Sequence, residues 1–141
     1  MTDFMEKFRL SGKTAWITGA SYGIGFAIAK AFHAAGARIV FNDINQELVD
    51  RGLNAYREEG IPAQGFVCDV TDEQQVTDLV RHIESDIAPI DILVNNAGII
   101  RRVPMIEMSV EEFRKVVDVD LNAPFICAKA VLPGTIARGH G

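Results

Sequence analysis

Three glycines stand where the chain could form a phosphate-binding turn. Gly19, Gly23 and Gly25 lie in the segment Thr18–Gly25, which follows a short apolar run and opens a pattern of apolar residues at helical spacing. Such a turn lets the backbone approach a pyrophosphate and offers it the free N–H groups of the helix's first turn. The spacing G-x-x-x-G-x-G differs from the generic G-x-G-x-x-G pattern. We expect a phosphate cradle, with plain turn glycines as the alternative; its residues are Gly19, Ser21, Tyr22, Gly23, Ile24 and Gly25.

Polar and small residues follow two further apolar runs. Asp43 ends one of them, and a carboxylate there can accept hydrogen bonds from both hydroxyls of a ribose. A solvated or helix-capping aspartate is the alternative. After another run comes Asn95-Asn96-Ala97-Gly98, where small residues let the backbone approach a ribose and amides brace neighbouring strands. We expect contacts from Asn95, Ala97 and Gly98, although a plain turn also fits this composition.

Two arginines continue the same loop. Arg101 and Arg102 come shortly after Gly98. Paired guanidinium groups suit a substrate that carries a carboxylate, because they bind it through charge-assisted hydrogen bonds. Ordinary exposed arginines are the alternative.

The elements that would position these residues alternate between strands and helices. Asn45 is a predicted N-cap, and capping boxes at Thr71-x-x-Gln74 and Ser109-x-x-Glu112 predict two more helix starts. The strands are expected at 14–19, 37–41, 65–68 and 90–94, and the helices at 23–35, 45–60, after Thr71, after Ser109, and over 122–138 with Pro124 in the first turn.

This alternation predicts an α/β fold. Right-handed crossovers between apolar strands give a doubly wound parallel sheet, Rossmann-like, with strand order 3-2-1-4. A ligand would lie at the carboxyl ends of strands 1 and 4, where the strand order reverses.

Together, the glycine segment and Asn95–Gly98 resemble the short-chain dehydrogenase/reductase family, over essentially the whole chain. The resemblance implies an NAD(P)-dependent oxidoreductase in which Asp69 accepts from the adenine amino group and the Val70 N–H reaches a ring nitrogen. A capping role for Asp69 before Thr71 is the alternative.

NAD is favoured over NADP by two residues of this chain. Asp43 would repel the extra phosphate of NADP, by up to ~4 kcal/mol for two charges ~4 Å apart at an effective dielectric constant near 20. Ile44, Asn45 and Gln46 follow it, so no arginine stands directly beyond to offset the repulsion. Tyr22 occupies a position where NADP users of the family often carry a basic residue.

Asp120 is the candidate catalytic residue within the chain. The family usually places an asparagine before leucine at this point; here the sequence is Val119-Asp120-Leu121, with Asn122 two residues after Asp120. Either residue could bind the water that relays a proton, and helix capping is the alternative for both.

A group within the family suggests the substrate. The stretches Ala20–Ala29, Ile39–Gly52, Asn95–Met108 and Asp118–Phe125 resemble bacterial members that interconvert D-gluconate and 5-dehydro-D-gluconate. The resemblance implies hydride transfer at a secondary alcohol of a sugar acid, which agrees with Arg101 and Arg102. Another sugar or a polyol is the alternative substrate, and a homo-oligomer is expected for the full-length form.

The family's Tyr-x-x-x-Lys pair is absent from these 141 residues. Tyr22 and Tyr56 are followed four residues later by Phe26 and Gly60. In the family the tyrosine is the general acid/base, the lysine lowers its pKa and a serine holds the substrate. We expect residues 1–141 to be the cofactor-binding part of one domain of roughly 250 residues, ending before a fifth strand and inactive by itself. A non-catalytic nucleotide-binding module and a purely structural α/β domain are the alternatives.

Composition excludes several other classes. The net charge is −5 and no basic cluster exceeds Arg101-Arg102, which argues against nucleic acid and anionic membranes as partners. No apolar run approaches the ~18 residues of a membrane helix. Cys68 and Cys127 lack C-x-x-C spacing and no histidine complements them, so neither a disulfide scaffold nor a metal site is expected. Charged residues near the N-terminus stand where a signal peptide would need an apolar core, so we expect a reducing, cytoplasmic setting.

Overall fold

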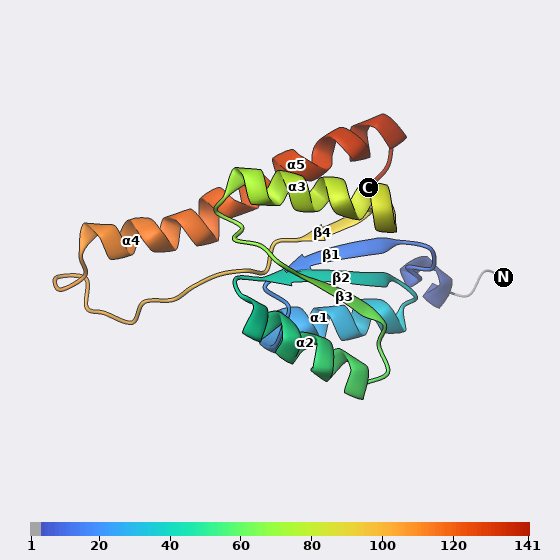
Figure 1. The fold of residues 1–141 in the computed structure, drawn as a ribbon, viewed down its shortest axis with the longest axis horizontal. Coiled ribbons are helices and arrows are strands. Elements are labelled where there is room, and N and C mark those ends of the chain that lie inside the picture. Colours follow the sequence, from blue (N-terminus) through green and yellow to red (C-terminus); the bar gives the residue numbers. More distant parts are fainter. Residues whose placement is uncertain (1–3) are drawn as a thin grey trace.

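The computed structural model describes residues 4–141 and shows three layers (Figure 1). Helices α1 and α2 cover one face of a four-stranded parallel sheet, and α3 and α5 cover the other. The strands lie in the order β3-β2-β1-β4, so the predicted sheet and its order are confirmed. The strands are β1 (Thr14–Thr18), β2 (Arg38–Asp43), β3 (Ala63–Val67) and β4 (Ile92–Val94); the helices are α1 (Gly23–Ala34), α2 (Gln46–Glu58), α3 (Glu73–His82), α4 (Val110–Val117) and α5 (Ala123–Arg138).

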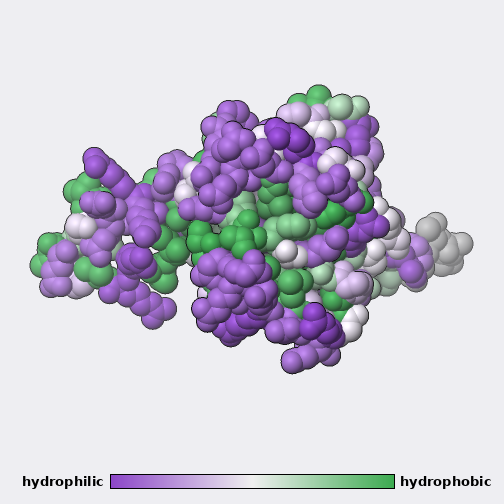
Figure 2. Space-filling view, in the orientation of Figure 1, coloured by the Kyte–Doolittle hydropathy of each residue, from purple (hydrophilic) through white to green (hydrophobic). Residues whose placement is uncertain are grey.

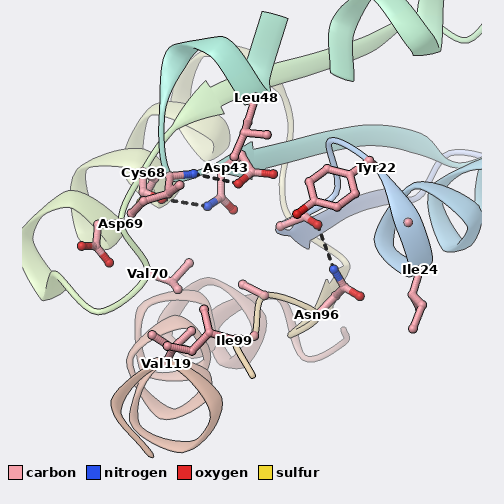
Figure 3. A pocket seen from close by; sticks show the side chains of 16 residues that line it. Tyr22, Ile24, Asp43, Leu48, Cys68, Asp69, Val70, Asn96, Ile99 and Val119 are labelled. Carbon is pink, nitrogen blue, oxygen red and sulfur yellow. Dashed lines mark hydrogen bonds between the residues drawn. The ribbon is translucent and has the colours of Figure 1, made fainter. Parts of the chain in front are cut away.

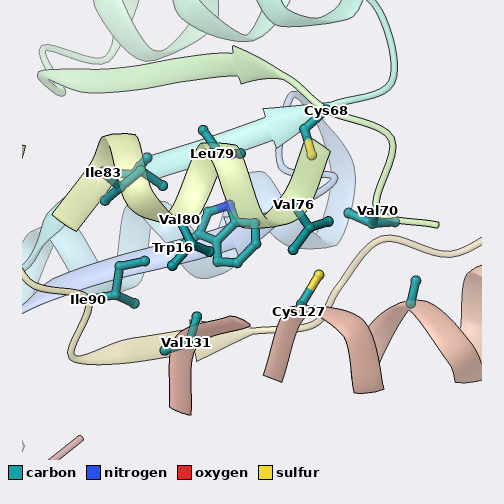
Figure 4. Packing of buried hydrophobic residues seen from close by; sticks show 12 residues of the cluster. Trp16, Cys68, Val70, Val76, Leu79, Val80, Ile83, Ile90, Cys127 and Val131 are labelled. Atoms are coloured by element: carbon teal, nitrogen blue, oxygen red, sulfur yellow. The ribbon is translucent and has the colours of Figure 1, made fainter. Parts of the chain in front are cut away.

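Side chains alternate across the sheet, as the pleat of a strand requires. Ile17 and Phe41 pack beneath α1 and α2, whereas Trp16 and Val40 face α3 and α5. All four are fully buried. Figure 4 shows the Trp16 indole among the aliphatic side chains of α3 and α5. Burial on both faces explains the nearly continuous apolar character of these strands.

Side-chain caps begin three of the helices. Asn45 Oδ1 accepts from the Leu48 N–H at 2.9 Å, and Ser109 with Glu112 forms a reciprocal capping box, both as predicted. The prediction at Thr71 is wrong. Asp72, the residue directly before α3, accepts from the backbone of Gln74 and Gln75, and these bonds hold its pKa below the usual range. A cap must immediately precede the first helical turn, and Thr71 lies one residue too early.

The helix predicted over 122–138 is confirmed as α5, with Pro124 in its first turn, and it is continuous with α4. A π-helical turn, η3 (Asp118–Asn122), joins α4 to α5, and Asn122 makes no capping bond. Pro124 lacks the N–H that would continue the i→i−4 ladder, and the Ala123 N–H bonds to the Asp118 carbonyl in the wider π pattern. Helix capping by Asp120 or Asn122 is therefore ruled out.

Residues 95–109 and α4 project from the three-layered body (Figure 1). Met105 and Ile106 on this segment are 93% and 95% exposed, and Figure 2 shows hydrophobic side chains in this part of the surface. Among the described helices, none is both long enough and apolar enough to cross a membrane.

A buried polar bridge joins the carboxyl ends of three strands. The Trp16 indole N–H donates to Asn42 Oδ1 at 3.0 Å, and Asn42 Nδ2 donates to the Cys68 carbonyl at 3.1 Å. Cys68 and Cys127 are unpaired and buried, and burial raises the pKa of each thiol to about 12. Both thiols are thus neutral groups of the core.

Replacing Asn42 by alanine should destabilise the protein. Two buried groups, the Trp16 N–H and the Cys68 carbonyl, would lose their partner, and each such loss costs about 1–3 kcal/mol. We expect urea unfolding to show a free energy of unfolding lower by about 2 kcal/mol or more. Asn54→Ala, which removes only an exposed bond to Arg57, is the control and should change it by less than about 0.5 kcal/mol. Equal effects of the two substitutions would contradict the bridge.

Candidate functional site

A pocket of about 400 Å³ opens at the carboxyl ends of the strands. Figure 3 shows its walls: Tyr22, Asp43 and Leu48 on one side, Cys68, Asp69 and Val70 next to them, and Ile99 with Val119 opposite. The loops after all four strands contribute to it. It is lined by Gly19, Tyr22, Gly23, Ile24, Asn42, Asp43, Ile44, Leu48, Cys68, Asp69, Val70, Asn96, Ala97, Gly98, Ile99 and Val119.

The amino terminus of α1 faces this pocket without a side-chain cap. Tyr22 occupies the N-cap position in an extended conformation, but its side chain makes no capping bond, and no acidic residue lies in the first turn. By contrast, Asn45, Asp72 and Ser109 cap α2, α3 and α4. The first N–H groups of α1 therefore remain available to a ligand, and the positive end of the helix dipole favours an anion.

Two glycines shape this end of the pocket for different reasons. Gly19 has φ +63°, and a Cβ there would lie 2.9 Å from the Ala97 Cα, so only glycine allows the two loops to touch. Gly23 has φ +66°, and an added Cβ would meet nothing within 4 Å. Gly23 thus supplies the left-handed turn and leaves open space over the helix end.

Hydrogen bonds between Thr18 and Asn96 fasten the end of β1 to the end of β4. Asn96 Nδ2 donates to the carbonyls of Thr18 and Gly19 at 2.9 and 3.0 Å. The Thr18 hydroxyl accepts from the backbone N–H groups of Asn96 and Ala97, both at 3.0 Å. Gly25 lies against this brace, because a Cβ there would come within 2.5 Å of Asn96 Nδ2.

The two strand-end carboxylates are both held by short local bonds. Asp43 Oδ1 accepts from the Ile44 N–H at 2.9 Å. Asp69 Oδ1 accepts from the N–H and hydroxyl of Thr71 at 2.9 and 2.7 Å. Neither caps a helix, since Asn45 and Asp72 do so. Each carboxylate lines the pocket.

Several predicted site residues lie outside the pocket wall. Ser21 is 1% exposed, and its hydroxyl has no hydrogen-bond partner in the described part of the chain. Gly25 is buried against Asn96, and Asn95 is exposed on the neighbouring turn. Arg101 and Arg102 are exposed on the projecting segment. The pKa of the Glu112 carboxyl is lowered chiefly by its hydrogen bonds with Ser109 and to a smaller extent by the positive charge of Arg101.

Asp120 connects the π turn to the segment after β4. Its Oδ1 accepts from the Ile99 N–H at 2.9 Å, and a Cβ at Gly98 would lie 3.3 Å from the same oxygen. Asp120 thus fixes the position of Ile99, which lines the pocket together with Val119. Asn122 bonds only to Asp118 on the exposed side of the turn.

Bracing of neighbouring strands by the Asn95–Asn96 amides, as predicted, is provided by Asn96, whereas the apolar part of the pocket wall was not predicted. Asn95 was the predicted contact residue of this segment, but Asn96 lines the pocket in its place. Ile44 and Leu48 follow Asp43 at the start of α2, where a one-turn spacing could have revealed them. The other unpredicted lining residues are Asn42, Cys68, Ile99 and Val119. No cluster of His, Cys, Asp or Glu able to hold a metal occurs within residues 4–141.

Comparison with known proteins gives a consistent result. The family model described as short chain dehydrogenase matches residues 13–141. A 2-keto-3-deoxy-D-gluconate dehydrogenase from Streptococcus agalactiae is 63% identical, with a TM-score of 0.87, and the match covers 100% of this chain and 53% of that one.

Two further matches are both named gluconate 5-dehydrogenase. A gluconate 5-dehydrogenase from Gluconobacter oxydans is 44% identical over 136 residues, which are 96% of this chain and 53% of the relative. A gluconate 5-dehydrogenase from Burkholderia cenocepacia, solved in complex with NADP and tartrate, is 41% identical with a TM-score of 0.88, covering 97% of this chain and 54% of that one. The chain thus spans about half the length of the relatives it matches.

Replacing Gly25 by alanine tests its contact with Asn96, because the contact decides whether the free energy of unfolding falls or rises. Inside a helix, glycine to alanine normally stabilises by about 0.5–1 kcal/mol. Here the methyl group would collide with Asn96 Nδ2 and the Ala20 Cα, at 2.5 and 2.9 Å, so we expect urea unfolding to show a loss of about 1–3 kcal/mol.

The matched control is Gly134→Ala in α5. There the added methyl group meets the ends of two flexible side chains, Glu84 and Arg138, which can move together, and the effect should be much smaller. A more stable Gly25→Ala protein would contradict the contact with Asn96.

Proposed function

The chain belongs to the short-chain dehydrogenase family, and on this basis we propose that its pocket binds NAD(H) or NADP(H) for an oxidoreductase reaction on a sugar acid. The observation that carries the proposal is the uncapped amino terminus of α1 beside two strand-end carboxylates in one pocket. A dinucleotide needs both features, an anion site and acceptors for hydroxyl and amino groups.

The residues fit such a cofactor. In the cradle, Gly19, Tyr22, Gly23 and Ile24 would face the pyrophosphate, while the buried Ser21 and Gly25 would support the loop from behind. The open space above Gly23 is where a side chain would obstruct the pyrophosphate. Asp43 would accept from the adenosine ribose, and Asp69 and Val70 would contact the adenine. Ala97 and Gly98 would form the wall towards the second ribose, and Asn95 would contact the cofactor from the rim beside them. Leu48 and Val70 offer an apolar surface to the base. The bound nicotinamide would accept or donate the hydride.

We expect Asp43 to favour NAD(H) over NADP(H). Its second carboxylate oxygen makes no hydrogen bond within residues 4–141, which leaves it available to a ribose hydroxyl but adverse to a phosphate at the same place. The relative from Burkholderia cenocepacia was solved with NADP, so both cofactors belong in the test.

The preference is measured by calorimetric titration of the purified protein with both cofactors. NAD(H) should bind more tightly, and Asp43→Ala should narrow the difference by weakening NAD(H) and releasing the repulsion on NADP(H). Asp50→Ala, which removes an exposed carboxylate from α2, is the control and should leave the difference unchanged. Tighter binding of NADP(H) by the unmodified protein would contradict the assignment.

For the substrate, we propose D-gluconate and 5-dehydro-D-gluconate, interconverted at a secondary alcohol. The relatives named gluconate 5-dehydrogenase support it, and so do Arg101 and Arg102 on the loop that leaves the pocket. The second candidate is 2-keto-3-deoxy-D-gluconate, favoured by the 63% identity to the enzyme named for it. Both are sugar acids, so the arginines suit either through the carboxylate.

The proposal assigns proton transfer to residues outside these 141, because the chain contains no Tyr-x-x-x-Lys. Tyr56 cannot serve, since its buried hydroxyl donates to the Ala20 carbonyl and burial raises its pKa. Asp120 is exposed and accepts from the Ile99 N–H; its proposed part in catalysis is to position the wall that contains Ile99. Residues 1–141 alone should therefore bind cofactor without turning over substrate.

The cysteines and the exposed apolar residues support proposals on the cellular setting and the oligomeric state. The unpaired cysteines support a reducing, cytoplasmic setting. Exposed apolar residues on α4 and the segment before it support a homo-oligomeric full-length form, which light scattering would measure.

The substrate assignment is tested by kinetics of the full-length enzyme with D-gluconate and 2-keto-3-deoxy-D-gluconate. Replacing Arg101 or Arg102 by alanine should raise KM about tenfold or more in at least one variant, because a charge-assisted bond of roughly 1.5–3 kcal/mol is lost. Arg114→Ala, on the exposed surface of α4, controls for the loss of a charge and should leave KM unchanged. Unchanged KM in both Arg101→Ala and Arg102→Ala would rule out the arginine assignment.

A further inference from the structure

Arg51 of α2 lies over the ring of Tyr22. The guanidinium carbon is 5.1 Å from the ring centroid, within the range of a cation–π interaction. Within residues 4–141 the Arg51 side chain forms no ion pair, so its charge is not neutralised by a neighbouring carboxylate. Both side chains are exposed, which leaves the outer side of the guanidinium open.

The docking of α2 on the glycine loop holds Arg51 in this place. A Cβ at Gly52, the next residue, would lie 2.9 Å from the Ser21 Cα, so glycine lets the helix touch the loop. One turn further on, the Tyr56 hydroxyl donates to the Ala20 carbonyl at 2.8 Å. These two contacts fix the helix against the loop that carries Tyr22.

The same helix face leads into the pocket. Leu48 lines the pocket and precedes Arg51 by three residues, the spacing that places side chains on one face of a helix. Tyr22 and Asp43 lie on that side of the pocket together with Leu48 (Figure 3). A cation is therefore held on Tyr22, a residue of the pocket wall that also contains Asp43.

We propose that Arg51, held on the Tyr22 ring, is a specificity-determining residue that binds the phosphate carried by the adenosine ribose of NADP(H). This rests on the proposed function of the pocket. A guanidinium binds phosphate through paired, charge-assisted hydrogen bonds and can keep its stacked position on an aromatic ring while doing so. Arg51 thus offsets the repulsion from Asp43, and the pocket admits NADP(H) as a second cofactor.

The test uses probes that differ by this phosphate. The purified protein and its Arg51→Ala variant are titrated calorimetrically with 5′-AMP and adenosine 2′,5′-bisphosphate, then with NAD⁺ and NADP⁺. Arg51→Ala should weaken the binding of the bisphosphate and NADP⁺ by about tenfold or more, the loss expected for one charge-assisted hydrogen bond. Binding of 5′-AMP and NAD⁺ should change by less than about twofold.

Arg57→Ala is the matched control, because Arg57 is an exposed arginine of the same helix whose guanidinium bonds to Asn54. It should leave all four affinities unchanged. Equal weakening of the bisphosphate by Arg57→Ala, or no weakening by Arg51→Ala, would overturn the role of Arg51 while leaving cofactor binding intact. If neither NAD⁺ nor NADP⁺ binds the unmodified protein, the proposed function itself fails.

Discussion

The hydrogen bonds between Thr18 and Asn96 are the constraint on which the site depends. β1 and β4 are paired over only three residues, yet the two loops beyond them must diverge to opposite sides of the sheet. Asn96 donates to the carbonyls of Thr18, the last residue of β1, and Gly19, and the Thr18 hydroxyl accepts from two N–H groups of the loop after β4. The loops are thereby held together at the point where the strand order reverses, and the opening between them is fixed rather than left to loop motion.

The glycine positions follow from that brace. Gly19 and Gly25 are each pressed against the Asn96–Ala97 turn, so a side chain at either would separate the loops. On the other side, Gly52 and Tyr56 dock α2 against Ser21 and Ala20. The loop that begins α1 is thus clamped from both flanks. Its N–H groups are presented in one orientation without a capping side chain, as a preorganised site for an anion would require.

Local signals in the sequence predicted the fold well. Apolar runs of strand length and helical spacing gave the parallel sheet and its order, because a strand buried on both faces has a plain signature. Asn45 and Ser109 were found as caps because a cap involves only residues within one turn. The helix over 122–138 was predicted too, whereas the π turn that joins it to α4 was not, because that turn depends on backbone bonding that no residue pattern encodes.

The site was predicted where it depends on the ends of strands and missed where it depends on packing. Asp43, Asp69 and Gly19 lie at or within two residues of the carboxyl ends of strands, so their place beside the pocket could be expected. Ile99 and Val119 meet only because Asp120 bonds across 21 residues to the Ile99 N–H. Arg51 was not predicted for the same reason. The residues immediately after Asp43 are uncharged, and Arg51 comes near the pocket only because its helix, α2, docks on the glycine loop and places the guanidinium over the Tyr22 ring.

Mapping NADH binding on the backbone amides tests the central claim most directly, namely that the carboxyl-end pocket is a dinucleotide site. The glycines mark the two ends of the sheet: Gly19 and Gly23 lie at the pocket, and Gly12, Gly36 and Gly60 lie before the strands at the opposite end. In nitrogen-15 NMR spectra, NADH should shift the amide signals of Gly19 and Gly23 saturably and leave those of the other three in place. Unshifted signals at Gly19 and Gly23, or saturable shifts only at Gly12, Gly36 and Gly60, would contradict the account.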